Sequence, residues 1–93
     1  MSDFRIFETD EYKTSLGRLS APAAEFVRRK LDEYVYRQLK ENPFFAPNIR
    51  KLQGYEPETW RYRMGRFRGF YTVDQQKRIV FILTTDDRKD AYR

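Results

Sequence analysis

The chain has 93 residues, the size of one small domain, so we expect a single domain over residues 1–93, and 17% of the residues are aromatic. It contains no cysteine and no histidine, which excludes disulfides, thiolate metal sites and the commonest metal ligand and general base. No apolar run approaches the ~18 residues needed to span a membrane, and residues 1–4 lack a signal-peptide pattern. We therefore expect a cytoplasmic protein with no membrane contact, metal or cofactor.

The positive charge is concentrated in the second half of the chain. Residues 1–48 carry eight basic and eight acidic residues, whereas residues 49–93 carry eleven basic and six acidic ones, which accounts for the whole net charge of +5. A basic half joined to a neutral half favours a nucleic acid or an acidic protein as partner over a general role in solubility.

The first half of the chain predicts one strand followed by two helices. β-favouring residues at 4–7 indicate a first strand. Thr9 is a candidate N-cap for a short helix, and Ser20 is one for a second helix that ends near residue 41, before Pro43. The apolar positions expected to face the core are Tyr12, Leu16 and Leu19 in the first helix, and Val27, Leu31, Tyr34, Val35 and Leu39 in the second.

On the outer side of the second helix, Glu25 with Arg29 and Glu33 with Arg37 have the spacing of weak ion pairs, each worth ~0.2–0.5 kcal/mol. The two helices form a hairpin that must cover an apolar surface, and the sheet predicted from the second half of the chain is the only candidate.

The second half predicts a loop and three strands. Residues 43–58 contain three prolines and a glycine and are expected to form a loop. Strands are expected at about 59–65, 67–73 and 78–85, and residues 79–83 are apolar at both parities, as in a central strand covered on both faces. The predicted fold class is α+β, with an N-terminal strand and a helical hairpin packed on one face of a small antiparallel sheet in the order β-α-α-β-β-β.

The strand predicted at about 59–65 alternates aromatic or apolar residues with arginines. A period of two sends Trp60, Tyr62 and Met64 to the core face, and it sends Arg61 and Arg63 to the other face. If a short turn follows, Arg68 of the next strand stands beside these two arginines. Three arginines on one face repel one another unless an anion lies between them, and the guanidinium group matches phosphate oxygens.

A structural alternative is that each arginine forms a surface ion pair. The carboxylates available near the arginines in the sequence are those of Glu56, Glu58, Asp86 and Asp87. Two aromatic residues also have two interpretations each. Phe70 either stacks a nucleobase beside the arginines or packs under the charged C-terminal tail expected at residues 86–92, and Tyr92 either folds over the basic face or anchors that tail on the core.

The second half resembles one protein family in several ordered segments. They are residues 48–55 (NIRKLQGY), residues 60–65 (WRYRMG), Phe67 with Arg68, Tyr71, and residues 87–92 (DRKDAY). Together these segments resemble the RelE/ParE superfamily, the toxins of type II toxin–antitoxin pairs. The resemblance covers nearly the whole chain and implies helices packed on one face of a small antiparallel sheet. Its RelE branch cuts mRNA in the ribosomal A site, and its ParE branch poisons DNA gyrase.

The resemblance also implies site residues. By position, the residues that bind and polarise the scissile phosphate are Arg61, Arg63, Arg68, Arg88 and Tyr92. Further residues expected to contact RNA are Arg50, Lys51, Arg66, Phe70 and Lys89. Two positions depart from the family pattern, because Arg66 stands where an acidic residue is frequent and Asp87 stands where many members have histidine.

The implied chemistry is metal-free attack of a ribose 2′-hydroxyl on the adjacent phosphate. Arginines suit the charged transition state but not proton abstraction, since a guanidinium is almost never neutral. In a chain without histidine, the base is Tyr92, Lys51, Lys89 or a group of the ribosome. The expected partners are a cognate acidic antitoxin, mRNA in the ribosomal A site and, only as the toxin–antitoxin complex, operator DNA.

Two further interpretations remain open. A ParE-like inhibitor of DNA gyrase would use the same basic surface and needs no catalytic base. A toxin-like protein without activity would persist only through its partner complex.

Overall fold

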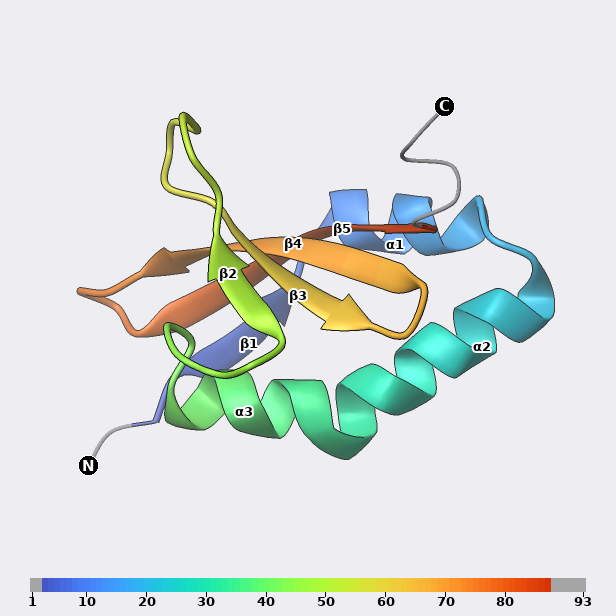
Figure 1. Ribbon diagram of the computed structural model, residues 1–93, viewed down its shortest axis with the longest axis horizontal. Coiled ribbons are helices and arrows are strands. Elements are labelled where there is room, and N and C mark those ends of the chain that lie inside the picture. The colour runs from blue at the N-terminus through green and yellow to red at the C-terminus, as the bar shows by residue number, and fades with distance from the viewer. Residues whose placement is uncertain (1–2, 88–93) are drawn as a thin grey trace.

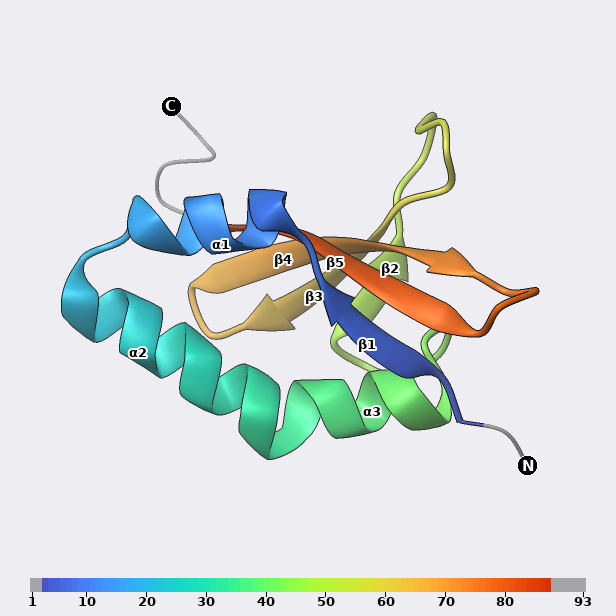
Figure 2. The ribbon, with the colours of Figure 1, turned by 180° about the vertical axis from the view of Figure 1, so that it is seen from behind.

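The computed structural model describes residues 3–87, which form a five-stranded sheet with a helical layer (Figures 1 and 2). The elements follow in the order β1 (Arg5–Glu8), α1 (Asp10–Gly17), α2 (Ala21–Lys30), a π-helical turn (Leu31–Val35), α3 (Tyr36–Glu41), β2 (Ile49–Lys51), β3 (Trp60–Met64), β4 (Phe67–Asp74) and β5 (Ile79–Asp87). The predicted α+β class is confirmed. Within residues 3–87, no helix is both long and apolar enough to cross a bilayer.

The strands lie in the order β1-β5-β4-β3-β2. The pairs β2–β3, β3–β4 and β4–β5 are antiparallel, whereas β1 runs parallel to β5. The parallel pair at one edge was not foreseen. The helices that follow β1 carry the chain across the sheet to its other edge, where β2 lies. Strands β1 and β5 are therefore joined by a long connection, as a parallel pair requires.

A short strand lies inside the segment predicted as loop. Residues 49–51 form β2, in which Arg50 pairs with Arg61 of β3. The loop prediction was wrong there because three residues carry too weak a pattern, while the open edge of β3 offers backbone groups that need hydrogen-bond partners. Two reciprocal amide hydrogen bonds hold the start of β2 on α3, at 3.2 Å from Gln38 Nε2 to Asn48 Oδ1 and at 3.0 Å from Asn48 Nδ2 to Gln38 Oε1.

Both predicted N-caps are confirmed. The Thr9 hydroxyl accepts a hydrogen bond from the Tyr12 amide at 3.1 Å, and the Ser20 hydroxyl accepts one from the Ala23 amide at 3.3 Å. Helix α1 then lies beside the C-terminal half of β5, where the Thr85 amide donates to Ser15 Oγ at 3.1 Å. The Ser15 hydroxyl thus accepts a backbone hydrogen bond from a part of β5 that does not pair with β1.

The long helical segment buries Val27, Leu31, Val35 and Leu39, each 0% exposed. A spacing of four residues drifts roughly 40° per step around an α-helix with 3.6 residues per turn. The π-helical turn at Leu31–Val35 rotates the stripe back, because it holds more residues per turn. Figure 1 shows this segment running beneath the sheet as one continuous layer.

Three expectations for the helical layer were wrong. Tyr34 is 36% exposed and faces outward. Among ion pairs between described residues, neither Glu25–Arg29 nor Glu33–Arg37 is formed. Arg29 instead lies over the Phe26 ring, with 5.8 Å from its Cζ to the ring centroid.

The absence of the Glu33–Arg37 ion pair has a geometric cause in the helix. Glu33 lies inside the π-helical turn and Arg37 lies just beyond it. The turn changes the angular spacing on which an i,i+4 pair depends.

The core forms between this layer and one face of the sheet. Tyr62, Tyr71, Val80 and Ile82 are 0% exposed, and the Tyr71 hydroxyl donates to the Pro43 carbonyl at 2.6 Å. Trp60 was predicted as core and is half-buried at the rim, 5.3 Å from the Phe44 ring centroid.

The expectation that the last strand is covered on both of its faces was wrong. On the side of β5 away from the helices, Phe81 is half-buried, and its ring contacts the 54%-exposed Phe7 at a centroid distance of 5.7 Å. The sheet therefore keeps one face that the helices do not cover.

Gly69 is required by the close approach of the Tyr62 ring. A Cβ atom built at Gly69 would lie closer than 3.0 Å to three Tyr62 atoms, and that ring is fully buried against Tyr71. We expect Gly69→Ala to destabilise the fold by about 1–3 kcal/mol through overpacking. Urea denaturation measures this change.

Gly17→Ala is the matched control, since no atom lies within 4 Å of a Cβ built at Gly17. It should be neutral or stabilising, because alanine favours helices. Equal stability of Gly69→Ala and the unaltered protein would contradict this account of the core.

Candidate nucleic-acid interface

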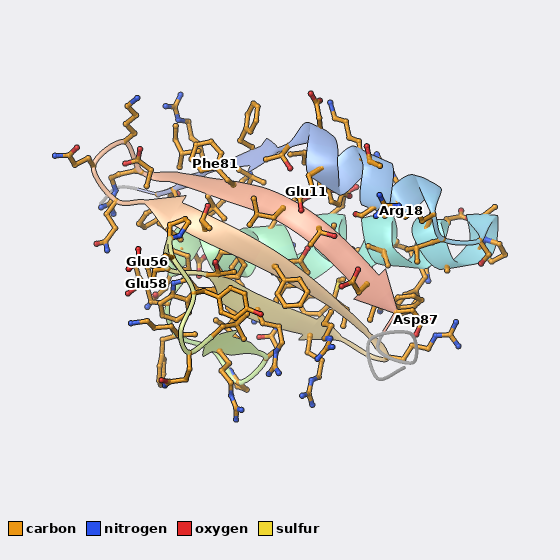
Figure 3. All side chains as sticks on the ribbon, turned by 90° about the horizontal axis from the view of Figure 1, so that it is seen from above. Glu11, Arg18, Glu56, Glu58, Phe81 and Asp87 are labelled. Atoms are coloured by element: carbon orange, nitrogen blue, oxygen red, sulfur yellow. The ribbon has the colours of Figure 1, made fainter. Side chains whose placement is uncertain are left out.

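The alternation of β3 separates the two faces of the sheet as predicted. Tyr62 and Met64 are 0% and 1% exposed on the helical side. Arg61 is half-buried and Arg63 exposed on the uncovered side. Figure 3 views the molecule from that side, with α2 and α3 behind the strands. The arginines of β3 thus project from a rigid sheet rather than from a loop.

The strand register brings further residues onto the same face. In one row across the sheet, Arg50 of β2 pairs with Arg61, Arg61 with Phe70, and Phe70 with Thr84. In the next row, Arg63 pairs with Arg68 of β4, and Arg68 with Asp86 of β5. Paired residues on neighbouring strands point to the same face, with Cβ atoms about 4.5–5.5 Å apart. We call the surface formed by Arg50, Arg61, Arg63 and Arg68 the arginine face.

Two of the nearby carboxylates, those of Glu58 and Asp87, bind other cations. Among residues 3–87, Glu58 pairs with Lys51 at 2.7 Å and Asp87 pairs with Arg66 at 3.0 Å. Within the same range, the exposed guanidinium groups of Arg50 and Arg63 form no ion pair. These two arginines therefore do not follow the structural alternative, and their charge is available to a ligand.

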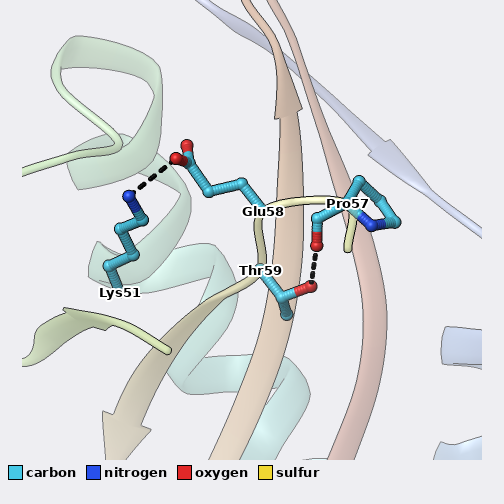
Figure 4. Close-up of polar contacts among 4 residues, drawn as sticks. All are labelled: Lys51, Pro57, Glu58 and Thr59. Atoms are coloured by element: carbon cyan, nitrogen blue, oxygen red, sulfur yellow. Dashed lines mark hydrogen bonds and ion pairs between the residues drawn. The ribbon is translucent and has the colours of Figure 1, made fainter. Parts of the chain in front are cut away.

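Lys51 and Arg66 are not brought to the arginine face. Lys51 pairs in register with Trp60, so it lies on the other side of β2, and its ammonium group binds Glu58 (Figure 4). Arg66 occupies the turn between β3 and β4, next to Gly65 with its φ of 60°, and its guanidinium lies 5.1 Å from the Phe67 ring centroid. Both side chains are held by local contacts.

The loop that leads into β3 is also ordered by local contacts. Thr59 Oγ1 donates to the Pro57 carbonyl at 2.9 Å (Figure 4). Figure 3 shows Glu56 and Glu58 on this loop, at the opposite end of the sheet from Asp87. The two carboxylates of the loop therefore lie away from the row of Arg63 and Arg68.

Phe70 lies within the arginine face. It is half-buried, stands opposite Arg61, and its ring centroid is 6.0 Å from Arg68 Cζ. Such a ring beside guanidinium groups offers a surface on which a base can stack. The predicted contributions of Arg88, Lys89 and Tyr92 lie outside the described residues.

Two residues of this face were not proposed as site residues from the sequence. Thr84 and Asp86 reach the face because β5 has a bulge, in which Phe70 pairs with Thr84 and Tyr71 with Ile82, so that Leu83 is an extra residue. The bulge reverses the parity of the strand after Ile82. The only available signal was the Thr84-Thr85-Asp86 sequence itself, which does not reveal the bulge.

Three comparisons relate the chain to known proteins. No protein-family model and no curated protein sequence matches it. Solved structures do match. The RelBE2 toxin–antitoxin complex of Mycobacterium tuberculosis gives a TM-score of 0.70 at 22% identity, covering 92% of this chain and 99% of that chain.

Two other solved structures agree with this match. A free mutant form of the Escherichia coli toxin RelE gives a TM-score of 0.64 at 20% identity, covering 99% of this chain and 90% of that chain. The RelE–RelB complex of Pyrococcus horikoshii gives a TM-score of 0.56 at 20% identity, covering 92% and 96%. The fold of this chain is that of the RelE toxins, as the sequence resemblance predicted.

Proposed function

We propose that this protein is the toxin of a toxin–antitoxin pair and that it cuts mRNA in the ribosomal A site. The observation that carries the proposal is the strand register, which places Arg63 opposite Arg68 and next to the row of Arg50 and Arg61. These arginines lie on a face that the helices leave uncovered. The likeness of the fold to RelE toxins supports it independently.

The arginine face suits the transition state of RNA cleavage. Attack of the 2′-hydroxyl on the adjacent phosphorus places additional negative charge on the non-bridging oxygens. Guanidinium groups held on a sheet stabilise that charge without rearranging during the reaction. In this proposal, Arg61, Arg63 and Arg68 hold the phosphate, Phe70 stacks a base, and Arg88 and Tyr92 contribute from the C-terminal segment.

The proposed reaction has a chemical signature. We expect mRNA cleaved on ribosomes to carry a 2′,3′-cyclic phosphate and a 5′-hydroxyl at the new ends. Cleavage should persist when EDTA removes all divalent metal except the Mg²⁺ that the ribosome itself needs. Replacing the 2′-hydroxyl of the scissile nucleotide by hydrogen should abolish cutting. Cleavage of the deoxy-substituted mRNA would exclude this mechanism.

The second candidate function is inhibition of DNA gyrase. The absence of histidine in the chain favours it, because binding a protein target needs no general base. A supercoiling assay with purified gyrase separates the two functions. Inhibition of supercoiling without any mRNA cleavage would replace the proposed function with this one.

The proposed partner is an acidic antitoxin, and the proposed site of action is the cytoplasm. Solved RelE structures include complexes with RelB antitoxins. The net charge of +5 favours a partner of opposite charge, and binding to operator DNA is proposed only for the complex. Co-purification from the native host should yield an acidic protein bound to this chain. Recovery of the free monomer alone would contradict this part of the proposal.

A further inference from the structure

One carboxylate stands in the row of Arg63 and Arg68. Asp86 on β5 pairs in register with Arg68, which in turn pairs with Arg63 on β3. All three side chains therefore leave the sheet on the same side. Asp86 is exposed, so its carboxylate is accessible to a ligand bound on the arginine face.

The bulge in β5 is what places Asp86 there. Val80 and Ile82 face the core and are 0% exposed, and an unbroken alternation would carry residue 86 to the same buried side. Because Leu83 is the extra residue, Thr85 faces the core instead, at 2% exposure, and Asp86 turns to the arginine face. Bulges frequently re-aim a side chain beside an active site.

Asp86 also differs from its neighbour Asp87 in its contacts. The Asp87 side chain is 13% exposed and pairs with Arg66 at 3.0 Å. The Asp86 side chain forms no ion pair and no hydrogen bond with residues 3–87. It contributes nothing evident to the fold and it offsets positive charge where an anion is expected to bind, so a chemical role explains its position better than a structural one.

We propose that Asp86 is the general base that activates the 2′-hydroxyl, an inference that rests on the proposed function. Arginine is unsuited to proton abstraction, and Lys51 is directed to Glu58 on the other side of β2. A carboxylate is a recognised general base.

A carboxylate oxygen of Asp86 takes the proton of the 2′-hydroxyl as O2′ forms its bond to phosphorus. The bond from phosphorus to O5′ breaks, and O5′ takes a proton from water. The products are a 2′,3′-cyclic phosphate and a 5′-hydroxyl, and Asp86 returns its proton to solvent. Arg68, paired with Asp86 in register, holds the phosphate next to the base.

The test compares Asp86→Asn with the unaltered protein on mRNA-programmed ribosomes. We expect the single-turnover rate of cleavage to fall about a hundred- to ten-thousandfold. Binding to ribosomes carrying a 2′-deoxy substitution at the scissile nucleotide should be unchanged or tighter, because a negative charge has been removed. Asp32→Asn is the matched control on the exposed helical side and should keep its rate within twofold.

Chemical rescue separates a base from a structural residue. Asp86→Ala should regain cleavage when formate is added, since a small carboxylate can occupy the vacated position, whereas Arg68→Ala should not respond to formate. A loss of cleavage in Asp86→Ala that formate leaves unchanged would overturn the proposal.

The outcomes also separate this inference from the function on which it rests. Cleavage by the unaltered protein that continues at the same rate in Asp86→Asn would overturn the role of Asp86 alone. No cleavage by the unaltered protein would overturn both. A slower Asp86→Asn that binds normally and an Asp86→Ala rescued by formate would establish the base.

Discussion

Replacing Arg68 with alanine is expected to lower the single-turnover rate of mRNA cleavage on ribosomes by about a hundred- to a thousandfold. This is the typical effect of removing one donor that stabilises a developing negative charge. Arg68 stands between Arg63 and Asp86 in the strand register, so in the proposed mechanism it is the arginine that lies beside both the phosphate and the base. Quenched-flow cleavage of labelled mRNA measures the rate.

Two variants sharpen this prediction. Arg68→Lys keeps the charge but loses the planar fork of donors, so it should recover only part of the rate. Arg37→Ala removes an exposed arginine from the helical side and should leave the rate within twofold. The assignment of the arginine face fails if Arg68→Ala retains its thermal unfolding temperature and cuts mRNA as fast as the unaltered protein.

Raising the pH above about 10 is expected to unfold the protein steeply. Burial is the main cause that raises the pKa of Tyr12, Tyr36, Tyr62 and Tyr71 above the ordinary value. For Tyr36 the pKa is raised further because its hydroxyl donates to Glu8 Oε2 at 2.6 Å. These hydroxyls keep their protons in the folded chain at a pH where the unfolded chain has lost them.

The free energy of unfolding falls with rising pH because of this difference in bound protons. The stabilisation is complete below the unfolded pKa near 10, and it is lost as the pH rises towards the higher folded values. Tyr62 and Tyr71 are 0% exposed, and each contributes a loss of about 1.4 kcal/mol per pH unit in that range. Two such groups consume much of a small domain's stability of about 5–15 kcal/mol within a few pH units.

Urea denaturation at pH 7, 9, 10 and 11 measures this effect. Tyr71→Phe should flatten the alkaline decline while losing about 1–2 kcal/mol at neutral pH, because it leaves the buried Pro43 carbonyl without its donor. Tyr55→Phe, at a position that is 57% exposed, should follow the unaltered protein. A free energy of unfolding that stays constant from pH 9 to 11 would contradict the account.

Local patterns predicted much of this fold. The Thr9 and Ser20 caps and the alternation along β3 depend on residues close together in the chain, and the structure has each of them. The parallel pairing of β1 with β5 and the existence of β2 depend instead on partners that lie far away in the sequence. Such pairings leave little local trace, and the π-helical turn was equally invisible to a search for α-helical spacing.

The arginine face was partly predictable for the same reason. Arg61 and Arg63 share a side by parity, and a two-residue turn brings Arg68 opposite Arg63. Arg50 joins them because β2 pairs with β3. The prediction of a loop at 43–58 places Arg50 near the arginines but does not give its register with Arg61. Lys51 and Arg66 are equally basic in the sequence, yet each is drawn to a carboxylate whose position only the folded chain reveals.

Asp86 could not be assigned to this face from the sequence, since its side of the sheet depends on a bulge opposite Phe70 and Tyr71. A bulge shifts every later residue of the strand to the other face, and no residue type marks it here. The same feature that escaped prediction is therefore the one that adds a candidate base to a face of arginines.

The most direct test of the central claim is primer extension on a defined mRNA, either naked or bound to translating ribosomes, after incubation with the purified protein. We predict new 5′ ends within A-site codons only on the ribosome-bound mRNA. Intact mRNA under both conditions would contradict the claim that this RelE-like fold carries a ribosome-dependent endoribonuclease.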